Sequence, residues 1–213
     1  MQRIEEELKR VQLLQEQIGI EFITSQKYKD QREWYTLGHF ANLLKKCKDD
    51  YPVYAIKTNP SDPDFITYAK HRNKFKSIEI VEILAPNRER TKEYIESAKL
   101  IEHQWKLIEL LDNPWSTFIS TLNGKFLKLY GTNCWLVIYH DISYSQITLF
   151  GFWHNTLLAN VKKWIESKKV DFDKCPYEKI FVIDANEKAL VSIYPSLIVL
   201  VPERTSSGYT QIL

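Results

Sequence analysis

Hydrophobic and polar positions follow two periods along this chain, one typical of helices and one typical of strands. A repeat of three to four residues predicts helices, and short apolar or alternating segments predict strands. The predicted helices cover residues 2–18, 31–48, 86–111, 115–130 and 155–168. The predicted strands cover residues 51–58, 64–69, 77–84, 135–139, 179–184, 189–194 and 197–201.

The order of these segments indicates the fold class. A helix is followed by a hairpin, by further helices, by a buried strand, and then by another helix and more strands. Residues 135–139 are apolar throughout, as expected of a central strand that is buried on both faces. We therefore expect an α/β protein in which a mixed central sheet is flanked by helices, an αβα sandwich.

The length of 213 residues favours one main domain. We place this domain at residues 26–201, with a helical arm at 1–25 before it and a polar tail at 202–213 after it. Apolar residues of the arm fall near a heptad seam, which Gln15 interrupts. Two alternatives follow: the arm forms a homodimer, or it packs on its own domain.

Charge and cysteine content narrow the function only slightly. The 29 basic and 27 acidic residues nearly cancel, so a nucleic-acid-binding face would have to be a local patch. Cys47, Cys134 and Cys175 lack the spacing of a zinc site or a disulfide framework, which favours a reducing, cytoplasmic location. The chain has no apolar run of about 20 residues, so we expect no membrane span.

Acidic residues stand out in the predicted hairpin. Asp64 begins its first strand, and both Glu79 and Glu82 lie in its second strand. Neighbouring strands are about 4.8 Å apart, so Asp64 can lie close to one of the two glutamates. Only one of the two glutamates can lie on the same face of the sheet as the Asp64 side chain, because Glu79 and Glu82 point to opposite faces. A carboxylate among aliphatic neighbours is costly to bury without a partner or a metal ion.

Two neighbouring carboxylates suit a hard divalent cation such as Mg²⁺ or Mn²⁺. Mg²⁺ is commonly held by one or two carboxylates together with phosphates and water. A cation in that position can activate water and stabilise a phosphodiester under attack. Glu82 has an alternative partner, because it could pair with a Lys or Arg of a helix.

These residues resemble the motif of the PD-(D/E)xK nuclease superfamily. Pro63-Asp64 matches its first part and Glu79-Ile80-Val81 matches its second, with Val81 where the family has lysine. The resemblance implies a restriction-endonuclease-like fold and Mg²⁺-dependent cleavage of phosphodiester bonds in DNA, or in RNA. It implies Asp64 and Glu79 as metal ligands, with Glu82 as the alternative acid and the main-chain carbonyl of Ile80 as a further ligand.

Two helices offer further residues to this site. Glu33 shares the apolar face of helix 31–48, and by position it matches a helical glutamate found before the motif strand in related nucleases. A plain alternative is a first-turn glutamate that the helix dipole favours. Lys125 could replace the missing lysine, because it lies about 60° from the apolar face of its helix. Lys128 lies about 120° away and is expected in solvent, although both could be ordinary surface lysines.

Two basic groups flank the expected site in sequence. One is the turn at residues 70–76, and the other consists of Arg88, Arg90 and Lys92. Such residues could bind phosphates without regard to sequence, although a charged turn can also simply be solvated.

The sequence leaves two functions open. The first is a metal-dependent endonuclease acting on nucleic acid, with DNA expected first. The alternative is a catalytically inactive nuclease-fold protein that binds nucleic acid or a protein.

Overall fold

The computed structural model describes residues 1–19, 21–22, 25–48, 50–84, 115–128, 130, 133–141, 170–184, 190–196 and 198–201. The helices predicted at 86–111 and 155–168 and the polar tail lie outside these residues. The basic group of Arg88, Arg90 and Lys92 lies outside them as well.

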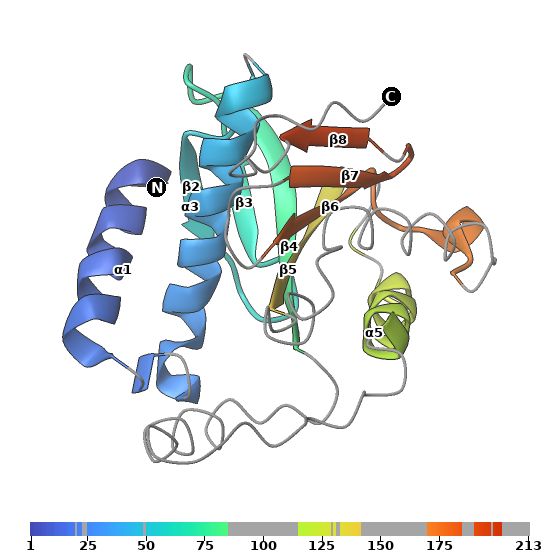
Figure 1. Ribbon diagram of the computed structural model, residues 1–213. Coiled ribbons are helices and arrows are strands. Elements are labelled where there is room, and N and C mark those ends of the chain that lie inside the picture. The colour runs from blue at the N-terminus through green and yellow to red at the C-terminus, as the bar shows by residue number, and fades with distance from the viewer. Residues whose placement is uncertain are drawn as a thin grey trace, which may run out of the picture.

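The described part contains a mixed sheet and helices on both of its faces (Figure 1). The helices are α1 (Ile4–Ile18), α3 (Lys29–Cys47) and α5 (Trp115–Phe126), with 3-10 turns at Gln26–Tyr28 and Phe172–Lys174. The strands are β1 (Gln2–Arg3), β2 (Tyr54–Lys57), β3 (Phe65–Tyr68), β4 (Lys74–Leu84), β5 (Cys134–Asp141), β6 (Lys179–Asp184), β7 (Leu190–Tyr194) and β8 (Ile198–Val201). The expected α/β class is confirmed.

The strands follow one another across the sheet in the order of the sequence. Strands β1 to β4 are antiparallel neighbours, β4 to β6 are parallel, and β7 and β8 are again antiparallel. The strands predicted at 64–69, 77–84 and 135–139 therefore lie side by side as β3, β4 and β5. The apolar strand β5 has parallel partners on both edges, which explains its near-continuous hydrophobic sequence.

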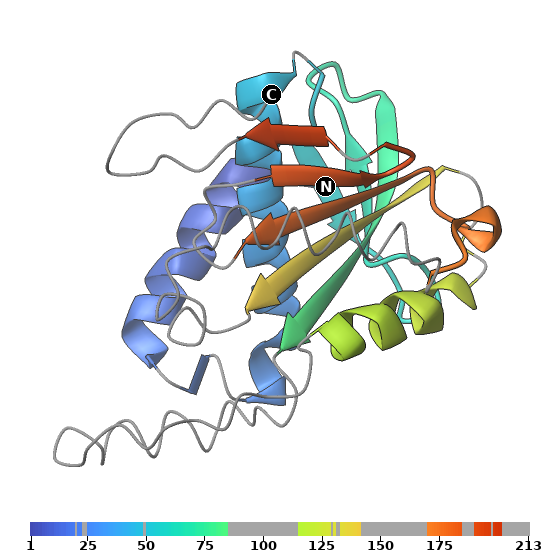
Figure 2. The same cartoon turned by 45° about the vertical axis from the view of Figure 1, so that its right-hand side comes forward.

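Each face of the sheet has its own core. On one face, Ile78 and Ile80 of β4 belong to the same cluster as Leu37 and Phe40 of α3. On the other, Ile83 of β4 clusters with side chains of α5. Figure 2 shows α5 on the face opposite to α1 and α3. Because side chains alternate along β4, Glu79 points toward α5, whereas Glu82 lies on the face of α3.

Helix α1 packs on its own domain, which is one of the two alternatives expected for the arm. Ile4, Leu8 and Val11 are buried. A Cβ atom at Gly38 of α3 would lie 2.7 Å from the Cβ of Leu8, so the missing side chain lets the two helices approach closely. A homodimer through α1 remains a prediction, and it would have to use exposed residues such as Leu13.

Several predicted boundaries differ by a few residues, and two of these differences affect the expected site. Strand β4 begins at Lys74, so the basic turn is confined to residues 69–73. Within this turn Arg72 has a positive φ of 62°, and its N–H donates a hydrogen bond to Ala69 O. This turn is at the end of β3 away from Asp64, so it does not flank the expected site. Helix α5 ends at Phe126 and not at residue 130, and this moves Lys128 out of the helical phase.

No helix of the described residues is long and apolar enough to cross a membrane.

Candidate active site

Asp64 lies immediately before β3, where its side chain reaches the backbone of β4. Its Oδ2 atom accepts a hydrogen bond of 2.7 Å from the Ile80 N–H. The register pairs Phe65 with Ile78, which places Asp64 opposite Glu79 when the antiparallel ladder is extended by one residue. The hairpin therefore brings together the two acids that the sequence pattern singled out.

Glu79 is buried on the side of the sheet that faces α5. Only 2% of its surface is exposed, and its Oε1 atom accepts hydrogen bonds from three side chains. Lys125 Nζ lies at 2.5 Å, Lys128 Nζ at 3.1 Å and the Tyr130 hydroxyl at 3.3 Å. The predicted reach of Lys125 toward the sheet is thus seen as an ion pair with Glu79.

Lys128 is exposed, as predicted, but it also contacts the buried acid Glu79, which was not predicted. Its ammonium contacts Glu79 and also lies 2.6 Å from the Tyr130 hydroxyl, although 44% of the side chain remains exposed. Partial burial alone would lower the pKa of Lys128, but the hydrogen bonds to Tyr130 and Glu79 outweigh it and raise that pKa. The contact with Glu79 could not be predicted from helical phase, because the chain leaves the helix after Phe126 and residue 128 no longer follows that phase.

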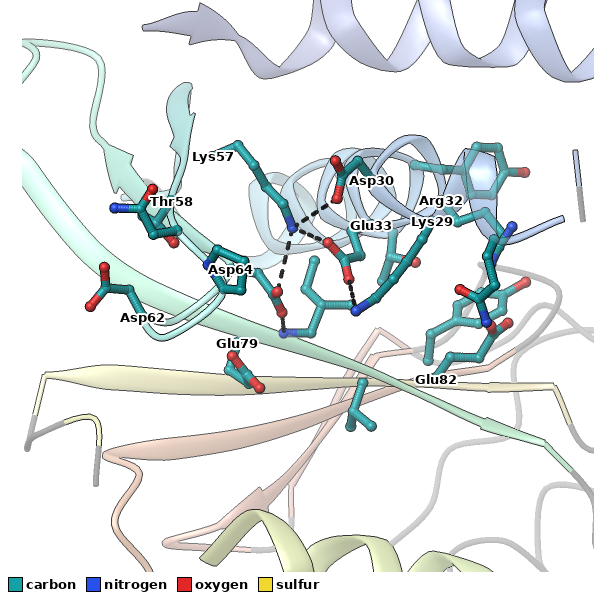
Figure 3. A pocket seen from close by; sticks show the side chains of 18 of the residues that line it. Lys29, Asp30, Arg32, Glu33, Lys57, Thr58, Asp62, Asp64, Glu79 and Glu82 are labelled. Atoms are coloured by element: carbon teal, nitrogen blue, oxygen red, sulfur yellow. Dashed lines mark hydrogen bonds and ion pairs between the residues drawn. The ribbon is translucent and has the colours of Figure 1, made fainter. Parts of the chain in front are cut away.

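Glu33 approaches the site from the other face of the sheet. It is buried in the second turn of α3, as its place on the apolar face predicted. Its carboxylate forms an ion pair with Lys57, the last residue of β2, and a weaker one with Lys29 at 3.7 Å. Figure 3 shows Glu33 and Lys57 on one side of β4 and Glu79 on the other.

Lys57 is the site residue that sequence reasoning missed. Its Nζ contacts Glu33 and lies 3.4 Å from Asp64 Oδ1 and 3.8 Å from Asp30 Oδ1 (Figure 3). It also lies 4.7 Å from the centre of the Phe65 ring. A signal was present in the sequence, because Lys57 shares the strand face of the buried Ala55. A lysine on an inward strand face requires an anionic partner.

Burial and mutual repulsion act on the acids of this site. Burial raises the pKa of Asp64 most, and the charge of Glu79 raises it further, against the Ile80 N–H and Lys57. Burial likewise raises the pKa of Glu33, followed by the charge of Asp64, with Lys57 opposing both. Asp64 and Glu33 are therefore less readily ionised in the folded chain than in water, and the charge of Lys57 offsets part of this effect on both acids.

One cavity of about 860 Å³ joins these groups. Among its lining residues are all those proposed from the sequence for the site: Glu33, Asp64, Glu79, Ile80, Glu82 and Lys125. Glu82 is exposed and lies on the face of α3, while Glu79 is the buried acid whose charge acts on Asp64. The geometry favours Glu79 over Glu82 as the partner of Asp64.

A divalent cation is compatible with these residues. The described residues contain no group of three or more His, Cys, Asp or Glu side chains arranged to hold a metal. Mg²⁺ does not need such a group, since one or two carboxylates with phosphates and water suffice. Because the Ile80 N–H faces Asp64, the carbonyl of the same residue points to the same edge of the strand and can serve as a further ligand.

Comparison of the chain with protein-family models, curated proteins and solved structures yields no match. The function therefore has to be argued from the residues of the site.

Proposed function

We propose that the protein is a metal-dependent endonuclease of the PD-(D/E)xK type. The observation that carries the proposal is the meeting of Asp64 and Glu79 in one cavity, with Lys125 paired to Glu79. Asp64 precedes β3 and is partly buried, Glu79 is buried in the neighbouring strand β4, and the charge of Glu79 raises the pKa of Asp64. This arrangement favours binding of a cation. Asp64 and Glu79 are the acids that the resemblance implies, whereas Val81 departs from it.

Asp64, Glu79 and the Ile80 carbonyl would hold Mg²⁺ or Mn²⁺. The cation, when bound, would supply positive charge for a phosphodiester under attack and lower the pKa of a nearby water molecule. The ammonium groups that now contact the two acids show that the carboxylates accept positive charge in this geometry. Glu82 stands farther along β4 and is the second choice as a ligand.

Lys125 would provide the charge that the family places at the position of Val81. Val81 is on the same strand face as Glu79 and packs against the core beside α5, so the distance from that position to α5 is short. Lys125 would orient the attacking water or a phosphate oxygen. Glu33, on the other side of β4, would support the water or a second cation.

The substrate we propose is nucleic acid, with DNA first and RNA second. A cavity of about 860 Å³ lined by both acids and lysines can hold a phosphodiester together with its cation. The basic turn at residues 69–73 is too far along the hairpin to line the site, so any role in binding would be at a distance from the cleaved bond. The described cysteines are free, in keeping with the proposed cytoplasmic location.

Val81 favours a second function, a nuclease-fold protein that binds nucleic acid or protein without cleaving it. A hydrophobic side chain at the motif lysine position packs in the core beside α5 and cannot orient water. In that case the ion pairs of Asp64 and Glu79 would be structural.

The test is cleavage of supercoiled plasmid, single-stranded DNA and RNA by the full chain in Mg²⁺ or Mn²⁺. We expect cleavage of at least one substrate, loss of activity in excess chelator, and loss of activity in Asp64→Asn. If the wild-type protein cleaves none of them, the enzyme proposal is wrong. Retained binding of nucleic acid in a mobility-shift assay would then favour the second function.

A further inference from the structure

Lys57 occupies a place between two acids of the proposed metal site. Its ammonium contacts Glu33 Oε2 and lies 3.4 Å from Asp64 Oδ1. The Phe65 ring lies 4.7 Å away, and only 26% of the side chain is exposed. The ammonium is therefore held by packing as well as by charge.

This contact differs from the ion pairs formed on the protein surface. Exposed pairs in this chain, such as Lys9 with Glu5, are screened by water and contribute little. The pairs of Lys57 are inside the cavity, where removal of Lys57 would take away the nearest counter-charge of Glu33 and Asp64. Asp64 is the acid that connects the two sides of the site, because its Oδ1 atom contacts Lys57 and the charges of Glu79 and Lys125 also act on it.

We propose that Lys57 is the built-in counter-ion of the metal site and competes with the divalent cation for Asp64 and Glu33. The inference rests on the proposed function and adds to it a means of regulating metal occupancy. Without metal, Lys57 stabilises the pair of acids. With metal, its positive charge opposes the cation, so the site binds metal more weakly than its carboxylates alone would.

The experiment is calorimetric titration of the full chain with Mn²⁺, comparing wild type with Lys57→Met. Methionine keeps the length and packing of the stem but lacks the charge. Removing a unit charge a few ångströms from a divalent cation should tighten Mn²⁺ binding by about tenfold or more. Lys57→Arg keeps the charge and should bind Mn²⁺ with nearly the wild-type affinity.

Lys29→Met is the matched control. Lys29 also pairs with Glu33, but at 3.7 Å and with 65% of its side chain exposed. Solvent and salt screen such a charge, so its removal should change Mn²⁺ affinity by no more than about twofold. This control separates an effect of position from a general effect of lowering the positive charge.

Thermal melting in chelator and in Mn²⁺ gives an independent measurement. Lys57→Met should melt below wild type in excess chelator, and its gain on adding Mn²⁺ should exceed that of wild type, because tighter binding to the folded state stabilises more. If Lys57→Met does not fold without metal, Lys57→Gln is used for the same measurements, since its amide can still hydrogen-bond to the acids.

The results distinguish the two proposals. Suppose that wild type binds Mn²⁺, that Asp64→Asn does not, and that Lys57→Met binds it no more tightly than wild type. The metal site would then be supported, and the proposed role of Lys57 would be wrong. Absence of Mn²⁺ binding in wild type and variant alike would show that the metal site itself is wrong, and the inference would fall with it.

Discussion

Lys125 Nζ on α5 lies 2.5 Å from Glu79 Oε1 on β4, although 46 residues separate them in the chain. The pair connects α5 to the buried acid of β4. It places a positive charge beside Glu79, on the strand face that also carries Val81. The first prediction follows from this contact.

Lys125→Ala should lower turnover by about 10²–10³, the range for loss of one preorganised donor in the transition state. The Michaelis constant should change little, because binding common to ground and transition states is retained. Steady-state cleavage kinetics measure both. Lys128→Ala should cost less, since Lys128 is farther from Glu79 and more exposed.

A lysine placed at Val81 in the Lys125→Ala background should restore part of the rate, because that side chain shares the strand face of Glu79. If Lys125→Ala cleaves as fast as wild type, Lys125 does not provide the missing charge. Lys128 and Lys57 would then be the next lysines to replace.

The choice between the two glutamates is testable by metal binding. Glu79→Gln should abolish binding of Mn²⁺, because Glu79 is the buried acid beside Asp64. Glu82→Gln should leave binding largely intact, since Glu82 is exposed on the other strand face. Calorimetric titration of both variants decides the matter. Equal loss in the two variants, or loss in Glu82→Gln alone, would contradict the assignment.

The raised pKa of Asp64 predicts how stability depends on pH. Burial, and then the charge of Glu79, raise this pKa above the ordinary value of 3.8, so the folded chain holds the proton more tightly than the unfolded chain. The contribution of Asp64 to stability is therefore fully present below the unfolded pKa and is lost as the pH rises through the folded pKa.

Asp64→Asn removes this titration. In excess chelator, the free energy of unfolding of wild type minus that of Asp64→Asn should fall as the pH rises from 3.8 toward neutrality. Denaturant unfolding at a series of pH values measures it. A difference that rises with pH over this range would mean that Lys57 and the Ile80 N–H lower the pKa of Asp64 by more than burial and the charge of Glu79 raise it.

The close contact of α1 with α3 predicts opposite effects for two glycine replacements. Gly38→Ala should destabilise the protein by about 1–3 kcal/mol, because its Cβ would meet Leu8 at 2.7 Å. Gly124→Ala is the control, since nothing lies within 4 Å of a Cβ there, and it should gain up to about 1 kcal/mol from helix propensity. Denaturant midpoints measure both. A neutral Gly38→Ala would show that α1 can move away from α3 without cost.

The sequence alone predicted most of the helices and strands that the structure describes, and the acids that line the cavity. Strand β6 has the predicted bounds of residues 179–184, and the apolar run at 135–139 is the parallel strand β5. The alternation in 77–84 separated Glu79 from Glu82 correctly, because a strand must turn successive side chains to opposite faces. Glu33 was recognised as a buried acid for a similar reason, since helical period places it with Leu37.

Only the tertiary structure decided which lysines meet these acids. Lys57, Lys125 and Lys128 come from a strand, a helix and the segment after that helix, and no local period relates their positions. Their meeting depends on where β2 ends, on which face α5 covers, and on where α5 stops. Contacts between distant segments are set by packing of the whole sheet, whereas periodicity reports only the direction of a side chain within its own element.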